Sequence, residues 1–115
     1  MKVIIAGGRD FNNKKLLFDT MDNFIKNNEV IEIVCGCARG ADSIGEEWAK
    51  SRKISIKYFP ANWNEFGKRA GFIRNHQMGD YADFLVAFWD GKSKGTKDMI
   101  DYMQKLGKHG TVIKY

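Results

Sequence analysis

The chain has 115 residues, of which 43% are hydrophobic and 13% aromatic, enough for one compact core and hardly for two. Its 19 Lys and Arg residues exceed its 14 Asp and Glu residues and give a net charge of +5, which favours anionic partners. The basic residues are scattered and form no run typical of a nucleic-acid-binding arm. The excess charge therefore fits a small phosphorylated ligand as well as DNA or RNA.

The apolar runs and the cysteines indicate a soluble protein of a reducing compartment. The run Val3–Ala6 is too short for a signal peptide and no later segment reaches membrane-spanning length, so we expect a cytoplasmic protein with no membrane partner. Cys35 and Cys37 are poorly placed for an unstrained disulfide and are interpreted as reduced thiols. His76 and His109 lack metal-motif spacing, so we expect no metal site.

Taken in chain order, the hydrophobic pattern alternates between strands and helices. Short apolar runs predict strands over residues 2–6, 30–34, 54–59, 84–88 and 111–114. Apolar residues at helical spacing predict helices over residues 14–27, 41–49, 68–81 and 96–106, and the segment ANWNEFG at 61–67 reads as a turn. No repeat or linker interrupts the pattern, so residues 1–115 are predicted to form a single domain.

Strands that alternate with helices predict the fold class. Parallel neighbours need right-handed crossover connections, so we expect an α/β, Rossmann-like three-layer sandwich with a five-stranded parallel sheet in the order 3-2-1-4-5. Ligands of such sheets bind beyond the carboxyl ends of the strands, near the point where the strand order reverses. The loops at 7–10 and 89–96 are then expected to face each other across one crevice.

The segment FLVAFWDGKSKGT at 84–96 combines a buried strand, a glycine-rich polar loop and a helix start. Backbone N–H groups at a helix start carry partial positive charge, so this loop is a candidate seat for phosphate or another anion. The alternative is a plain turn in which Thr96 caps the helix. Trp89 would either stack on a base or belong to the core. The ligand-binding residues predicted in this segment are Trp89, Asp90, Gly91, Ser93, Gly95 and Thr96.

The first two loops carry similar chemistry. In GGRDF, Gly7 and Gly8 precede Arg9, which would pair with a phosphate, and Asp10, which would accept from a ribose hydroxyl or a base. The alternative makes Arg9 a solvated residue and Asp10 a helix cap. The second loop, GCARGAD at 36–42, contributes Gly36, Arg39, Gly40 and Asp42 as predicted ligand-binding residues. It matches neither a Walker A loop nor the G-x-G-x-x-G dinucleotide pattern.

The third predicted helix adds the segment GKRAGFIRN at 67–75. Gly67 and Gly71 lie four residues apart, and Arg74 and Asn75 follow on the same helical face. Such a face lets another surface approach closely and presents donors to it. The alternative is that the glycines only loosen the helix while Arg74 is solvated.

Together these segments resemble the SLOG superfamily, which includes the Lonely-guy phosphoribohydrolases and the DNA-processing proteins of bacterial competence. The resemblance is closer to its small YpsA-related branch of bacteria and phages. The matching segments span most of the chain and are GGRDF at 7–11, GxARGAD at 36–42, AxWxxxGKxAGxxRN at 61–75 and AFWDGxSxGT at 87–96. The resemblance implies a site for a nucleotide or nucleotide derivative, with no separate cofactor, formed by Gly7, Gly8, Arg9, Gly36, Gly40, Asp42, Arg74, Gly91, Ser93, Gly95 and Thr96.

The resemblance does not carry over the catalytic residue. In the phosphoribohydrolases the glycine loop reads Pro-Gly-Gly-x-Gly-Thr-x-x-Glu, and its glutamate works with an arginine to cleave the N-glycosidic bond. Met99 stands in the place of that glutamate and cannot act as an acid or a base. Asp90, Asp10 or Asp42 would have to substitute, which would make a different active site.

Three functional hypotheses follow from the sequence. The first is a domain that binds or senses a nucleotide or nucleotide-derived ligand at the carboxyl edge of the sheet. The second is a nucleotide N-glycosidic hydrolase that uses a non-standard aspartate, with Asp90 considered first. The third, single-stranded DNA binding, ranks last because no added binding module or concentrated basic patch is present. Homodimerisation is compatible with the surface, but no interface is located.

Overall fold

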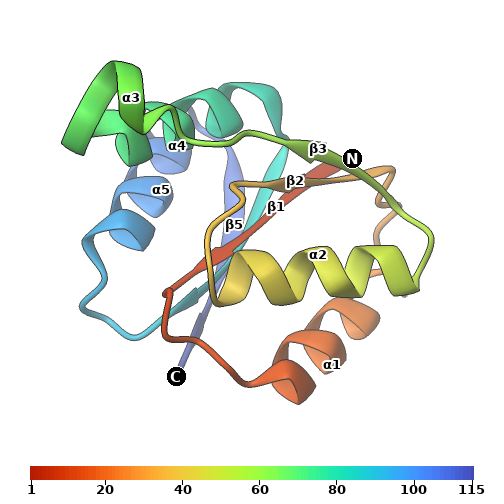
Figure 1. Cartoon of the computed structure of the whole chain (residues 1–115). Helices are drawn as coiled ribbons and strands as arrows, with labels where there is room; N and C mark the ends of the chain where they lie inside the picture. Colours follow the sequence, from red (N-terminus) through yellow and green to blue (C-terminus); the bar gives the residue numbers. More distant parts are fainter.

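The computed structural model describes all of residues 1–115 as an alternation of strands and helices (Figure 1). The strands are β1 (Lys2–Gly7), β2 (Glu32–Cys35), β3 (Ser55–Tyr58), β4 (Phe84–Trp89) and β5 (His109–Lys114). The helices are α1 (Lys14–Phe24), α2 (Ala41–Ser51), α3 (Trp63–Phe66), the 3-10 turn η1 (Gly67–Arg69), α4 (Ala70–Tyr81) and α5 (Lys94–Lys105). No helix is both long enough and apolar enough to span a bilayer.

The five strands form one parallel sheet in the order β3-β2-β1-β4-β5, which confirms the predicted α/β fold and strand order. β1 lies in the centre and pairs with β4 from Val3 opposite Phe84 to Gly7 opposite Phe88. Their carboxyl ends point toward the left of Figure 1, where β1 continues into the loop before α1 and β4 into the loop before α5. The strand order reverses between β1 and β4, so the loops that follow these two strands are neighbours in space.

Hydrophobic cores fill both faces of the sheet. In β1, Val3 and Ile5 pack with α1 and α2, whereas Ile4 and Ala6 pack with α4 and α5. Figure 1 shows the same division, with α1 and α2 together on one face and the other helices on the opposite face. This continuous burial explains why the first and fourth strands read as unbroken apolar runs in the sequence.

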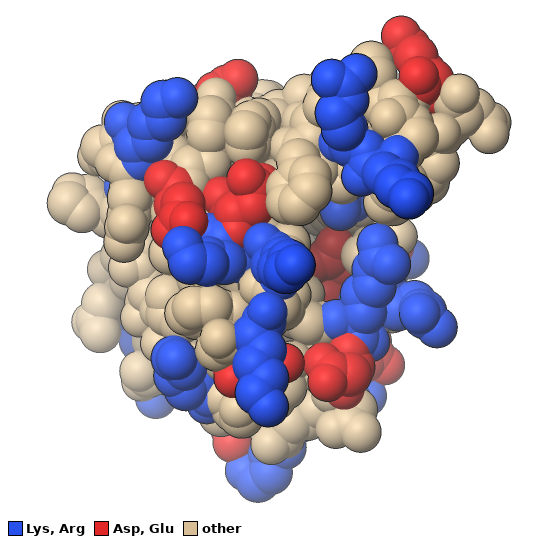
Figure 2. Space-filling view, turned by 90° about the vertical axis from the view of Figure 1, so that its left-hand side faces the viewer, with Lys and Arg blue, Asp and Glu red and all other residues tan.

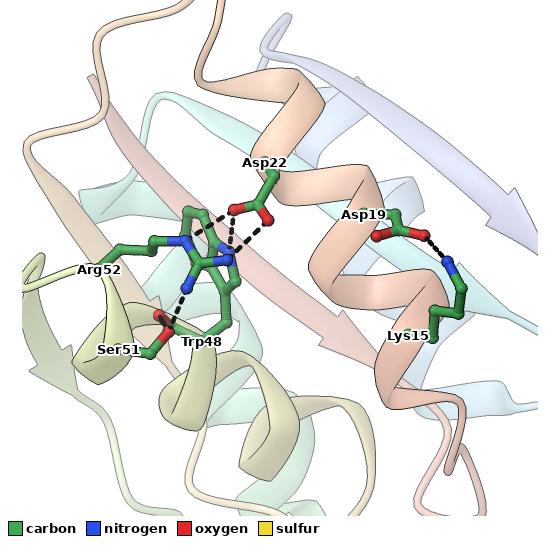
Figure 3. Close-up of polar contacts among 6 residues, drawn as sticks. All are labelled: Lys15, Asp19, Asp22, Trp48, Ser51 and Arg52. Carbon is green, nitrogen blue, oxygen red and sulfur yellow. Dashed lines mark hydrogen bonds and ion pairs between the residues drawn. The ribbon is translucent and has the colours of Figure 1, made fainter.

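A polar cluster joins α1 to α2 (Figure 3). Asp22 of α1 accepts hydrogen bonds from Trp48 Nε1 at 2.9 Å and from Arg52 Nε and Nη2 at 2.8 and 2.7 Å. The pKa of Asp22 is lowered, first by the hydrogen bond from Arg52 and then by that from Trp48. Because Trp48 is completely buried, Asp22 supplies the acceptor that its indole N–H cannot find in water.

The main departure from the prediction is at residues 61–69. The segment 61–67 was expected to be a turn, but it contains helix α3 and leads into the 3-10 turn, so α4 begins at Ala70 instead of residue 68. Asn62 accepts from the backbone N–H of Glu65 at 3.1 Å, and its amide donates to the Glu65 carboxylate at 3.0 Å. This reciprocal capping starts α3, and Gly67, with a φ of +58°, ends it after one turn.

Candidate functional site

A pocket of about 450 Å³ lies at the carboxyl ends of β1, β2 and β4. The loops that follow these three strands form its walls together with residues of α3, η1, α4 and α5. This is the edge at which parallel sheets of this class bind ligands. The pocket is lined by Ala6, Gly7, Gly8, Arg9, Asp10, Ala38, Asp42, Trp63, Lys68, Gly71, Phe72, Arg74, Asn75, Met78, Ser93, Gly95, Thr96 and Met99.

The loops after β1 and β2 are packed backbone against backbone. The carbonyl oxygen of Gly8 accepts hydrogen bonds from the N–H groups of Phe11 and Ala41. Gly40, which directly precedes Ala41, has a φ of +74°, and a Cβ there would collide with the Gly8 carbonyl. A Cβ on Gly7 would lie 2.7 Å from the Cβ of Ala41. Glycine is therefore required at these positions for the two loops to meet.

The loop after β4 forms a cap for α5. The Asp90 carboxylate accepts from the N–H groups of Ser93 and Lys92, both at 2.8 Å, and these bonds lower the pKa of Asp90. Ser93 in turn accepts from the N–H of Thr96. The N–H groups of the first helical residues, including Gly95, have no acceptor inside the helix. Gly95 lines the pocket and a Cβ there would meet no atom within 4 Å, so this helix start is open to a ligand.

Two neighbouring side chains of α4 hold the loops in place. Arg74 Nη1 donates to the carbonyl oxygen of Gly36 in the loop after β2. Asn75 Nδ2 donates to the carbonyl oxygen of Gly95 at 3.1 Å in the first turn of α5. Arg74 Nε also donates to Asn75 Oδ1 at 3.1 Å. Both residues are buried and line the pocket, so they tie two of its walls to α4.

The charges around the pocket are mixed, with an excess of cations. Arg9, Lys68 and Arg74 line it together with Asp10 and Asp42. Figure 2 looks onto the face at the left of Figure 1, and Lys and Arg side chains surround a recess there. Arg9 lies with its guanidinium carbon 5.9 Å from the centre of the Trp63 ring. This distribution favours an anionic ligand over a cationic one.

Asp42 is the most perturbed carboxyl group of the pocket. It is only 7% exposed and accepts from the N–H of Ala38 at 3.2 Å. Burial raises the pKa of Asp42 from 3.8 to about 6, although the Ala38 N–H and the guanidinium groups of Arg74 and Arg9 act in the opposite direction. A carboxyl group with a pKa near 6 can exchange a proton at neutral pH.

The other candidate catalytic residues have different surroundings. Asp10 lines the pocket and accepts from the hydroxyl of Tyr115 at 2.8 Å, whereas Asp90 caps α5 and does not line the pocket. Met99 is buried and lines the pocket. No group of three or more His, Cys, Asp or Glu side chains is arranged to hold a metal ion, and both cysteines are free thiols.

The structure brings most of the predicted ligand-binding residues together. Those that line the pocket are Gly7, Gly8, Arg9, Asp10, Asp42, Arg74, Asn75, Ser93, Gly95 and Thr96. Those that do not line it are Gly36, Arg39, Gly40, Trp89, Asp90 and Gly91. Trp89 instead donates through Nε1 to the Ser93 carbonyl at 3.0 Å. The Lys114 Nζ atom lies over its ring, 4.5 Å from the ring centre. Gly36 and Arg39 line a second, adjoining cavity.

Sequence reasoning missed the aromatic side of the pocket. Trp63 and Phe72 line it and are 50% and 43% exposed, and Lys68 and Gly71 lie beside them. Trp63 sits in the segment that was expected to be a turn, which hid its place at the pocket. The Asn62-x-x-Glu65 spacing is a signal that identifies the start of α3 and the direction of this segment.

Comparisons with known proteins give two matches. The family model described as "YAcAr: YspA, cpYpsA-related SLOG family" matches residues 1–66. The Gene 61 protein of Mycobacterium phage D29 is 32% identical over 113 residues, covering 92% of this chain and 90% of its own length. No solved structure gives a significant match.

Proposed function

Because the chain belongs to the YspA, cpYpsA-related SLOG family, whose membership suggests nucleotide-related binding or processing, we propose that it binds a nucleotide or nucleotide-derived ligand in the pocket at the carboxyl edge of the sheet. A pocket of about 450 Å³ lies in the range of small-molecule sites. The proposal makes the protein a binding or sensor domain whose signal is the occupancy of this pocket.

The observation that carries the proposal is the convergence of three kinds of group on one pocket. The start of α5 offers N–H groups without helical acceptors, beside the open position of Gly95. Arg9 and Lys68 add positive charge, and Trp63 and Phe72 add exposed aromatic rings. A nucleotide has an anionic phosphate and a flat base, and these groups recognise both.

In the proposed complex the phosphate lies at the first turn of α5 and the base lies against Trp63 or Phe72. The phosphate accepts from backbone N–H groups and is attracted by the Arg9 guanidinium. The ring of Trp63 is half exposed in the free protein and is covered by the base on binding. Stacking of this kind contributes about 1–3 kcal/mol for each base.

Isothermal titration calorimetry with AMP and a panel of other nucleotides tests the proposal. We expect Arg9→Ala and Trp63→Ala each to weaken binding of the best nucleotide about tenfold, because each removes one contact worth about 1.4 kcal/mol. Lys105→Ala is the matched control, since Lys105 lies at the opposite end of α5 from the pocket. The proposal is wrong if no nucleotide of the panel binds at millimolar concentration.

A second function, hydrolysis of a nucleotide N-glycosidic bond, is favoured by one observation at Asp42. This carboxyl group lies in the pocket, and its pKa of about 6 suits a general acid that protonates the leaving base. Release of free adenine from AMP, abolished in Asp42→Asn while AMP binding persists, would support hydrolysis. Intact AMP after long incubation with saturating protein would exclude AMP as a substrate and leave binding as the function.

A further inference from the structure

A second cavity of about 350 Å³ adjoins the pocket on the side of the loop after β2. It shares four residues with the pocket, namely Arg9, Ala38, Trp63 and Arg74. The loop after β4 and α5 contribute nothing to it. It is completed by Gly36, Cys37, Arg39, Pro60 and Ala61. The two spaces are therefore neighbours, and the second lies away from the start of α5.

The second cavity is more strongly cationic than the first. Three of its nine lining residues are arginines, Arg9, Arg39 and Arg74, and none of the nine is acidic. Neither Arg9 nor Arg39 takes part in an ion pair within the chain. A guanidinium group without a carboxylate partner beside a cavity can form paired hydrogen bonds to a phosphate or a carboxylate.

We propose that the ligand carries two separated anionic groups, one bound at the start of α5 and the other bound by Arg39 in the second cavity, with Arg9 between them. This inference rests on the proposed function and names the class of ligand as a nucleotide phosphorylated at two positions. A mononucleotide fills the pocket and leaves the second cavity to solvent. Arg9 and Trp63 lie between the two spaces, so the nucleoside passes over them and connects the two anions.

The first test compares affinities by calorimetry. Adenosine 3′,5′-bisphosphate carries its phosphates on opposite sides of the ribose, whereas AMP carries one and ADP carries two adjacent ones. We expect the bisphosphate to bind about tenfold more tightly than AMP, with ADP near AMP, since one charge-assisted contact is worth about that factor. Arg39→Ala should bring the ratio of the bisphosphate and AMP affinities close to one. Arg69→Ala should leave the ratio unchanged, because Arg69 is exposed and lines neither cavity.

The second test uses Cys37 as a reporter of occupancy. Cys37 is exposed and lines the second cavity, whereas Cys35 is buried and burial raises the pKa of its thiol to about 12. Iodoacetamide should therefore alkylate Cys37 selectively. We expect saturating adenosine 3′,5′-bisphosphate to slow the alkylation several-fold and saturating AMP to leave its rate nearly unchanged.

The outcomes separate this inference from the proposed function. If AMP binds and the bisphosphate neither binds more tightly nor protects Cys37, the second cavity is not an anion site while the nucleotide site stands. If neither nucleotide binds, both are overturned. A thymidine octanucleotide could instead bind more tightly than the bisphosphate, with an affinity that falls steeply with salt. In that case the second cavity binds a phosphate of single-stranded DNA, and the small-ligand inference is overturned.

Discussion

Replacing Asp42 by asparagine should make the free energy of unfolding less dependent on pH. The carboxyl group of Asp42 is buried, and its pKa is about 6 in the folded chain against an ordinary value of 3.8. Asparagine has nearly the same shape and keeps an oxygen that can accept from the N–H of Ala38. The substitution therefore removes the titration and leaves the packing nearly intact.

The size and sign of the effect follow from the two pKa values. Below pH 3.8 the carboxyl group is protonated in both the folded and the unfolded chain. Between pH 3.8 and about 6 the folded chain retains a proton that the unfolded chain has released, so the free energy of unfolding falls as the pH rises through this window. The two pKa values of Asp42 differ by about 2. Because one pKa unit corresponds to about 1.4 kcal/mol, the free energy of unfolding falls by about 3 kcal/mol across this window.

Urea unfolding of both proteins at several pH values measures this loss. At each pH the free energy of unfolding of the natural chain is subtracted from that of Asp42→Asn. We expect this difference to increase between pH 4 and 7.5 by most of the loss of about 3 kcal/mol. Asp90→Asn is the control. Because the pKa of Asp90 is lowered, titration of this carboxyl group changes the free energy of unfolding below pH 3.8, where stability rises with pH instead of falling. A difference for Asp42→Asn that stays constant over this range would refute the reasoning.

Further substitutions test the packing at the site and between the helices, each by urea unfolding. Gly7→Ala should lower the free energy of unfolding by about 1–3 kcal/mol, because its Cβ would collide with β4 and α2. Gly95→Ala has open space and a helical position, so it should leave stability equal or raise it by up to about 1 kcal/mol. Asp22→Ala should lower it by about 1–3 kcal/mol, because the buried indole N–H of Trp48 loses its acceptor. Arg52→Ala should lower it less, because the indole keeps that acceptor.

The fold could be predicted because its determinants are local patterns with a simple geometric meaning. The apolar runs at Val3–Ala6 and Leu85–Phe88 are buried on both faces, which is the pattern of a central parallel strand. The alternation of strands and helices then leaves few topologies. The helix α3 was missed because its four residues are too few to show a helical period, and its start depends on one cap at Asn62.

The candidate site was only partly predictable, because a sequence shows which residues follow a strand but not where their side chains point. Trp89 directly follows the apolar run of β4, yet its ring lies under Lys114 and its indole N–H donates to the Ser93 carbonyl of the same loop. Trp63 lies in the predicted turn at 61–67, outside the loops that were predicted to bind the ligand, and reaches the pocket only through the path of α3. The second cavity arises between Arg39 and Pro60, which belong to different crossovers, so no local pattern could indicate it.

The pair Arg74 and Asn75 shows that structural and functional interpretations of a motif need not compete. Both side chains bind loop carbonyls, and both line the pocket. The bond to Gly36 fixes the loop beside the second cavity, and the bond to Gly95 fixes the helix start that the proposed phosphate must meet, so both are ordered before a ligand arrives. Since Arg74 uses Nη1 and Nε in these contacts, its Nη2 remains without a hydrogen bond inside the chain, beside Gly71 at the pocket. One arginine thus supports the wall of the site and presents a donor to it.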